Sequence, residues 1–284
     1  MEVKVLYNGK SGNGRGLDEA KKIESVLTDD KIEYVDACTI DSYDEFMGSL
    51  PEGSKAVLCG GDGTLNYYIN HTSEATKNIP IDYFATGTGN DFLRDIEVPQ
   101  GEIVREVNRF FKNLPTVTIE GKKSFFLNAI GYGIDGYCCE VGDIQRAKSD
   151  KPVDYTGIAI KGILFHFKPV TATVNIDGNE FTVEKTWLVP TMKGRFYGGG
   201  MMACPKQDRL SADKKVSVMT YKTGFPLKAL IVFPGIFKGE HVKKDKVVQI
   251  YTGSHVKVKF DRPCALQIDG ETVLNVTEYE VNTQ

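Results

Sequence analysis

No stretch of this 284-residue sequence approaches the roughly 20 consecutive apolar residues that a membrane-spanning helix needs. A clear apolar run in the last third, residues 229–233, stops at Pro234. The first nine residues lack the basic stretch and long apolar core of a secretory signal, and they read as a first strand instead. The sequence therefore predicts a cytoplasmic protein without a membrane span.

Cysteine is scarce, and neither sign of charge dominates. Six cysteines, none in C-x-x-C spacing, are too few for a disulfide scaffold and do not fit a structural zinc site. The 35 basic and 38 acidic residues leave a net charge of −3. Because there is no basic field, binding through phosphate neutralisation has little support, and we expect no nucleic-acid partner.

Glycine, by contrast, is abundant: 29 of the 284 residues, against an average of about 7%. Many of these glycines lie in three loops, 9–16, 60–64 and 86–92, each directly after an expected strand. A glycine has no Cβ, so its backbone N–H can approach a phosphate closely, and the N-terminus of a following helix adds partial positive charge. Since ligands bind at the carboxyl ends of parallel strands, three such loops predict a nucleotide site on one sheet edge.

The first hundred residues alternate between strand and helix patterns. Expected strands lie at 3–7, 34–38, 56–59 and 81–85, and expected helices at 17–27, 43–50 and 65–71. This alternation predicts a parallel sheet covered by helices, that is, a three-layer α/β nucleotide-binding domain.

After residue 115, β-branched and aromatic residues with a period of two predict a β-rich, sandwich-like domain. Expected strands lie at 116–120, 123–129, 171–176, 181–189, 216–221, 247–252, 255–260 and 265–268, with helical patches at 154–165 and 227–233. The expected domains are 1–120 and 121–284. A last strand, 272–281, is compatible with either domain, and the sequence does not decide between them.

Two glycine-containing segments partly match named nucleotide-binding motifs. Gly9-Lys10-Ser11 resembles the end of a Walker P-loop, but the upstream glycine that this motif requires falls at Lys4, so the match fails. Residues 131–136 match G-x-G-x-x-G literally, yet no clear helix–strand unit with a ribose-binding acid follows, which favours a turn at the domain junction. Residues 60–64, Gly-Gly-Asp-Gly-Thr, are far more specific, because they follow a buried-type strand and open a helix.

Four segments together carry a family resemblance. They are Asn8-Gly9-Lys10-Ser11-Gly12, Gly60-Gly61-Asp62-Gly63-Thr64-Leu65-Asn66, Gly87-Thr88-Gly89-Asn90-Asp91-Phe92 and Gln267-Ile268-Asp269-Gly270-Glu271. Over essentially its whole length the chain resembles the diacylglycerol kinase catalytic-domain family, lipid kinases that include soluble bacterial enzymes and the sphingosine and ceramide kinases. The Gly-Gly-Asp-Gly-Thr motif also resembles NAD kinases, but the third and fourth segments favour the lipid kinases.

The resemblance implies roles for matched positions. The expected ATP contacts are Asn8, Lys10, Ser11, Thr39, Gly60, Gly61, Asp62, Gly63, Thr64, Leu65, Asn66 and Thr88. Glu271 corresponds to the family's proposed proton acceptor, and Asp269 in the same motif is the alternative acceptor. Asp62 and Asp269 are candidate acids for orienting a Mg²⁺ ion that bridges the phosphates.

The family also carries a structural Mg²⁺ in its second domain. The matching ligands would be the carboxylate of Asp213 and the backbone oxygens of Leu210 and Lys215. Two departures from the family pattern bear on these expectations. Asn8-Gly9 replaces the usual Asn-Pro, and Lys214 stands where a glycine normally follows the aspartate. Few acidic residues surround this segment, which weakens the expectation, since a hard cation requires several oxygen ligands.

The implied activity is transfer of the γ-phosphate of ATP to the hydroxyl of diacylglycerol or a similar lipid. Three alternatives stay open: a sphingoid-base kinase, an NAD kinase, and a nucleotide-binding regulatory protein without catalysis. Because the substrate is a membrane lipid, we expect transient peripheral contact with the inner membrane surface. Residues 225–238 and 197–202 are candidates for lipid contact. Core packing is the favoured explanation for most of 225–238, and the glycines of 197–202 are explained equally well by backbone geometry. A homodimer remains open.

Overall fold

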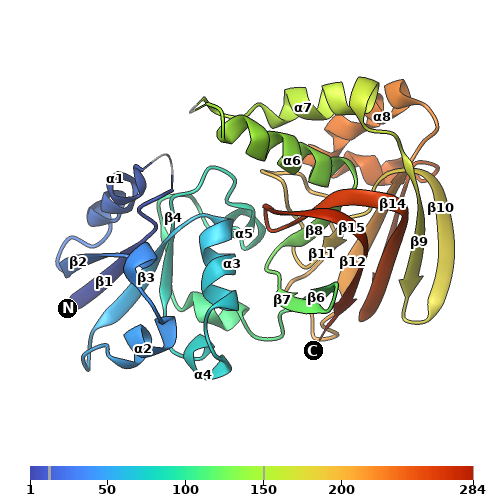
Figure 1. The fold of residues 1–284 in the computed structure, drawn as a ribbon. Helices are drawn as coiled ribbons and strands as arrows, with labels where there is room; N and C mark the ends of the chain where they lie inside the picture. The colour runs from blue at the N-terminus through green and yellow to red at the C-terminus, as the bar shows by residue number, and fades with distance from the viewer. Residues whose placement is uncertain (12–13, 150, 284) are drawn as a thin grey trace. The chain divides into compact units, whose positions relative to one another are not determined.

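The computed structural model describes residues 1–11, 14–149 and 151–283. The chain divides into two compact units, Met1–Asn113 and Leu114–Gln284, here called unit 1 and unit 2. This division lies a few residues before the boundary expected near residue 120. Both the α/β fold of unit 1 and the β-rich fold of unit 2 agree with the predicted fold class (Figure 1).

Unit 1 contains a five-stranded sheet in the order β2-β1-β3-β4-β5. Its strands are β1 (Glu2–Tyr7), β2 (Lys31–Asp36), β3 (Lys55–Gly60), β4 (Asp82–Ala85) and β5 (Ile103–Val104). The first four are parallel, and β5 pairs antiparallel to β4. The α-helices are α1 (Gly16–Ala20), α2 (Tyr43–Gly48), α3 (Asp62–Asn70), α4 (Glu74–Lys77) and α5 (Asp91–Asp95). Three 3₁₀ segments complete the unit: η1 (Lys21–Ser25), η2 (Ala37–Thr39) and η3 (Val107–Phe110).

Alternating apolar residues of the central strands form one core of unit 1. Val3 and Val5 of β1 and Val57 of β3 pack with Ala20 and Ile23 from the helical segment that follows β1. This packing fixes the positions of the strand ends, and therefore also of the loops that begin there.

Unit 2 is built around a ten-stranded sheet whose pairings are all antiparallel. Its strands are β6 (Thr116–Ile119), β7 (Lys122–Phe125), β8 (Ala129–Tyr132), β9 (Val170–Ile176), β10 (Asn179–Leu188), β11 (Thr191–Met192), β12 (Val216–Lys222), β13 (Val248–Gly253), β14 (His255–Ile268) and β15 (Glu271–Asn282). Because β14 pairs with both β8 and β9, the sheet closes into a ring. The last strand, β15, pairs with β14 and β6 and so belongs to unit 2.

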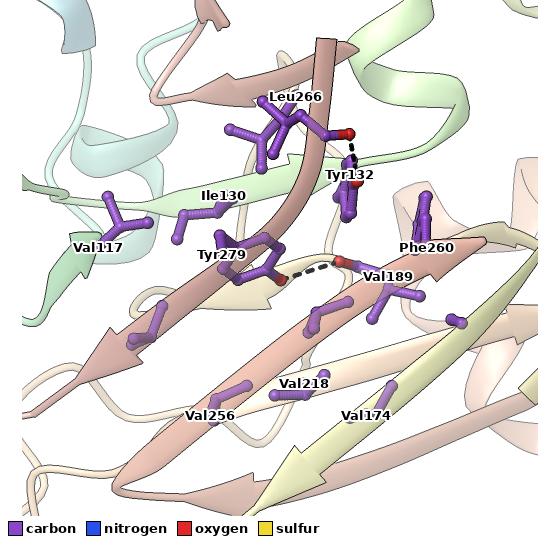
Figure 2. Packing of buried hydrophobic residues seen from close by; sticks show 14 of the residues in the cluster. Val117, Ile130, Tyr132, Val174, Val189, Val218, Val256, Phe260, Leu266 and Tyr279 are labelled. Carbon is purple, nitrogen blue, oxygen red and sulfur yellow. Dashed lines mark hydrogen bonds between the residues drawn. The ribbon is translucent and has the colours of Figure 1, made fainter. Parts of the chain in front are cut away.

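The interior of this ring is a dense apolar cluster (Figure 2). Tyr132 of β8 stacks on Phe260 of β14, with ring centroids 3.7 Å apart. The buried hydroxyl of Tyr279 donates to the Val189 carbonyl at 3.3 Å, so burial of the ring does not leave its polar group unpaired.

Helices cover part of unit 2. They are α6 (Ile134–Arg146), α7 (Tyr155–Lys161) and α8 (Pro226–Val232), with the π-helical turn η4 (Gly162–His166) and the 3₁₀ segments η5 (Phe233–Lys238) and η6 (Glu240–Lys243). None of the helices within the described part of the chain is long and apolar enough to cross a membrane. All six cysteines are free thiols.

The sequence interpretation was wrong about α6. Residues 131–136, expected to form a turn without a following helix, end β8 and begin this 13-residue helix. Because glycines normally weaken a helix, the glycines in this segment argued against a helix in the sequence. Gly136 is there because a Cβ would lie 1.9 Å from the Ala265 carbonyl oxygen, so glycine lets α6 pack directly against β14.

Candidate functional site

In unit 1 the carboxyl ends of β1 and β2 are joined by a residue that sequence reasoning missed, Asp36. Its Oδ1 accepts hydrogen bonds from the backbone N–H groups of Gly9 and Cys38, each at 3.0 Å. These bonds lower the pKa of Asp36, the one from Cys38 most. A proline at position 9, the usual family residue, would lack the N–H that Asp36 accepts. The only sequence signal for Asp36 is its place at the end of an expected strand.

The first loop is organised around Asn8. Its carbonyl accepts from the N–H and the hydroxyl of Ser11, at 3.0 and 2.8 Å, and its side-chain oxygen accepts from the Lys10 N–H at 2.9 Å. The Lys10 side chain is exposed, and the Thr39 hydroxyl donates to the Asp36 carbonyl at 2.8 Å. The four predicted contacts of this region therefore lie at one sheet edge. Gly12, also part of the predicted motif, lies outside the described residues.

The loops after β3 and β4 lie against each other. A Cβ on Gly87 would lie 2.6 Å from the Gly61 Cα atom, and a Cβ on Gly60 would lie 2.2 Å from the Thr64 hydroxyl oxygen. Helix α3 begins inside the motif, with Gly61 as its N-cap. Glycines are thus required here for close backbone approach, and the helix N-terminus behind them favours an anion.

Asp62 links these two loops. Its carboxylate oxygens accept from the backbone N–H groups of Asp91 and Phe92, at 2.9 and 3.0 Å, and so cap the start of α5. Thr88 is exposed on the loop between β4 and α5. The Leu65 side chain is completely buried, so only the backbone of Leu65 can contact a ligand. Asn66 is held from the next turn, where the Asn70 amide donates to its backbone oxygen at 3.0 Å and to its side-chain oxygen at 3.2 Å.

In unit 2 the hairpin between β14 and β15 carries Asp269 and Glu271. The Asp269 carboxylate accepts from three consecutive backbone N–H groups, those of Leu127, Asn128 and Ala129, at 2.5, 2.8 and 2.9 Å. Glu271 follows at the start of β15 with its side chain exposed. Asp269 therefore fastens the hairpin, and Glu271 is the carboxylate that the hairpin presents to solvent.

Two further residues that the sequence did not single out complete this region. Buried Arg209 donates to the Leu127 carbonyl at 3.3 Å and to the Asn128 side-chain oxygen at 2.9 Å. On the other side, the Thr272 hydroxyl donates to Asp143 of α6 at 2.6 Å. Single arginine and threonine residues carry no motif, so only the fold could reveal that Arg209 and Thr272 support the hairpin.

The 197–202 segment, a candidate for lipid contact, turns inward at its first residue. Tyr197 is buried, and its hydroxyl donates to the buried Asp135 at 2.8 Å. Burial raises the pKa of Asp135 to about 6, although the bond from Tyr197 opposes that rise. The glycines that follow have positive φ angles, so they serve the turn geometry.

The segment expected to hold a structural Mg²⁺ does not fit that ion. Oδ1 of Asp213 accepts from the Ser211 hydroxyl at 2.7 Å and from the Lys215 N–H at 3.2 Å, and the Lys215 ammonium lies 4.0 Å from Oδ2. The Lys215 carbonyl, an expected ligand, accepts from the Gln207 amide at 3.0 Å. Among the residues that the structure describes, no three His, Cys, Asp or Glu side chains form a metal-binding group. The carboxylate of Asp213 and the Lys215 carbonyl are therefore engaged within the protein, and the metal role expected for Leu210 stays a prediction.

Comparison with known proteins also divides the chain into two domains. Residues 2–118 match the model of the diacylglycerol kinase catalytic domain, and residues 128–281 match that of the YegS C-terminal NAD kinase beta sandwich-like domain. A diacylglycerol kinase of Mycobacterium tuberculosis is 26% identical over 259 residues, which cover 87% of this chain and 81% of that protein. A diacylglycerol kinase of Bacillus subtilis is 24% identical over 230 residues, covering 78% and 73%.

A solved structure of a diacylglycerol kinase from Bacillus anthracis has the same fold. Its TM-score is 0.63 at 20% identity, with 99% of this chain and 93% of that chain covered. Both family models match in the expected order along the chain, and the second alone spans more than half of it. The chain belongs to the diacylglycerol kinase catalytic-domain family of lipid kinases, with a YegS-type C-terminal domain.

Proposed function

We propose that this protein transfers the γ-phosphate of ATP to the hydroxyl of diacylglycerol, or of a lipid close to it, giving phosphatidic acid from diacylglycerol. The observation that carries the proposal is the anchored hairpin of unit 2, in which Asp269 is tied to three backbone N–H groups and Glu271 is exposed. The family resemblance associates this hairpin with lipid kinases, whereas the glycine loops alone are shared with NAD kinases.

In the proposed reaction, Mg·ATP is a substrate held by the glycine loops of unit 1. Backbone N–H groups around Gly61 and Gly87, the N-terminus of α3 and the exposed Lys10 ammonium offset the charge of the phosphates. The lipid hydroxyl oxygen forms the new bond to the γ-phosphorus as the bond to ADP breaks, and Glu271 accepts the hydroxyl proton.

The two aspartates have different proposed roles. Asp269 already accepts three backbone N–H groups, so its carboxylate is engaged in holding the hairpin. We assign it to positioning Glu271. Asp62 likewise fixes the start of α5, and the lone pairs that remain on its carboxylate can still face a nucleotide-bound cation.

A panel of acceptors tests the proposal. Purified protein is incubated with labelled Mg·ATP and, separately, with diacylglycerol, sphingosine and ceramide in mixed micelles and with NAD in buffer. We expect label in diacylglycerol above all others. Label in NAD alone would identify an NAD kinase, label in sphingosine a sphingoid-base kinase, and ATP binding without transfer to any acceptor a regulatory protein.

A further inference from the structure

Glu271 lies between two fixed points of the β14–β15 hairpin. On its N-terminal side, the Asp269 carboxylate is anchored to the backbone of residues 127–129. On its C-terminal side, the Thr272 hydroxyl donates to Oδ2 of Asp143 at 2.6 Å. The first fixed point joins the hairpin to the loop before β8, and the second joins it to helix α6. The candidate proton acceptor is therefore the residue that these two anchors enclose.

The register of the hairpin decides which way the side chains around Glu271 face. Thr272 pairs with Gln267, and Glu271 pairs with Ile268. Because successive side chains of a strand point to opposite faces, Thr272 and Glu271 lie on opposite sides of β15. Glu271 shares its side with Ile268 and Val273, which pack against the interior cluster of the sheet. A hydrogen bond that holds Thr272 on α6 therefore also fixes the side of the strand from which Glu271 projects.

Helix α6 gives this hydrogen bond a firm support. The helix packs against both β14 and β15 (Figure 1), and its contact with β14 at Gly136 leaves no room for a Cβ. Asp143 is itself held on the helix, because Arg146, one turn further on, pairs with Oδ1 and also donates to the Tyr155 hydroxyl of α7. The carboxylate thus presents one oxygen to Arg146 and the other to Thr272.

The stability of unit 2 does not account for this arrangement. The Asp143 side chain is 44% exposed and that of Arg146 is 51% exposed, and exposed ion pairs add little to the free energy of unfolding. The placement of Glu271 is far more sensitive, since a reacting group displaced by about 1 Å can lose about 10²-fold in rate. The hydrogen bond from Thr272 therefore matters more for the geometry of Glu271 than for folding.

We propose that Asp143 is a positioning residue for phosphoryl transfer. Through Thr272 it fixes the first residues of β15, so that the Glu271 carboxylate meets the hydroxyl of the acceptor lipid. This inference rests on the proposed function, because it takes Glu271 as the proton acceptor. Asp143 stays outside the reaction and supplies only a hydrogen-bond acceptor, which an amide oxygen can also supply.

Steady-state kinetics with diacylglycerol and Mg·ATP test this role. Asp143→Ala and Thr272→Val should each lower kcat about tenfold, with the KM for ATP unchanged because the glycine loops are untouched. Asp143→Asn and Thr272→Ser keep the hydrogen bond and should stay within about threefold of the wild type. The double variant should lose no more than either single variant, since both remove the same bond. Glu140→Ala on α6 and Thr277→Val on β15 are the matched controls.

Hydrogen exchange reports on the hairpin without turnover. The amides of residues 270–274 should exchange faster in Asp143→Ala and Thr272→Val than in the wild type, and at the wild-type rate in both controls. A wild type that transfers phosphate to no acceptor would overturn the proposed function and the catalytic role of Asp143 with it, whatever the exchange result.

The inference alone is overturned by two other results. The first is an active wild type whose Asp143→Ala and Thr272→Val variants match the controls in kcat. The second is an Asp143→Asn variant that loses as much kcat as Asp143→Ala, because the charge and not the hydrogen bond would then be required.

Discussion

Single carboxylates in this protein differ sharply in what surrounds them, and their environment separates their roles. Asp36, Asp62 and Asp269 each accept several backbone N–H groups and hold loops in place. Glu271 is exposed at the start of a strand. The sequence placed Asp62, Asp269 and Glu271 in motifs and offered Glu271 or Asp269 as the proton acceptor, but it could not show which of these carboxylates hold loops in place. That division depends on backbone partners, and for Asp269 these lie more than a hundred residues away.

Asp135 supplies a prediction about pH. Its folded-state pKa of about 6 lies above the ordinary value of 3.8 for an aspartate, because burial disfavours the charged form. Between these values the folded state retains a proton that the unfolded state releases, so stability falls as pH rises from about 4 to 6. Asp135→Asn removes this loss of stability at high pH, because the amide does not ionise, and it keeps an oxygen that accepts the Tyr197 hydrogen bond. We expect the variant to gain up to about 3 kcal/mol over the wild type at pH 7.5 and little at pH 4.

Urea unfolding of both proteins across this pH range measures the difference. Glu140→Gln, on the same helix, is the control for a general effect of charge removal on α6. An equal gain at pH 4 and pH 7.5 would contradict the raised pKa.

At the scale of elements, local patterns predicted most strands and the alternating order of unit 1. In unit 1 each unit of a parallel strand, a glycine loop and a helix is a short continuous stretch, so its pattern is visible in the sequence. Helix α6 was missed because Gly136 is required by the Ala265 carbonyl, a contact far away in the chain. For the same reason β14 was divided into two strands, although it runs without interruption from His255 to Ile268.

The contact between two glycine loops gives a prediction at this scale. In Gly87→Ala the new methyl group would lie 2.6 Å from the Gly61 Cα atom and 2.8 Å from the Asn90 side-chain oxygen. The loops must separate, so we expect ATP affinity to fall at least tenfold while the protein still folds. Gly48→Ala is the control, because nothing lies within 4 Å of its Cβ position. Calorimetric ATP binding compares the two, and equal affinities would show that the loop contact does not shape the site.

For the whole molecule, the absent fit for a structural cation predicts stability without metal. Lysine ammonium groups near Asp213 supply the positive charge that the family's ion would provide. We therefore expect the melting temperature without nucleotide to be the same in EDTA and in millimolar Mg²⁺. An ion present at a concentration 100 times its dissociation constant would add about 2.7 kcal/mol to the free energy of unfolding, which a melting curve detects easily. A Mg²⁺-dependent rise that disappears in Asp213→Asn would contradict the assignment.

The central claim, a lipid kinase whose proton acceptor is Glu271, is tested most directly by the turnover of diacylglycerol with labelled Mg·ATP. The wild type should form labelled phosphatidic acid, and Glu271→Gln should lose about 10²–10⁴-fold in kcat while its melting temperature is unchanged. Glu278→Gln, on the same strand, should retain wild-type turnover. No phosphatidic acid from the wild type, or undiminished turnover in Glu271→Gln, would contradict the account.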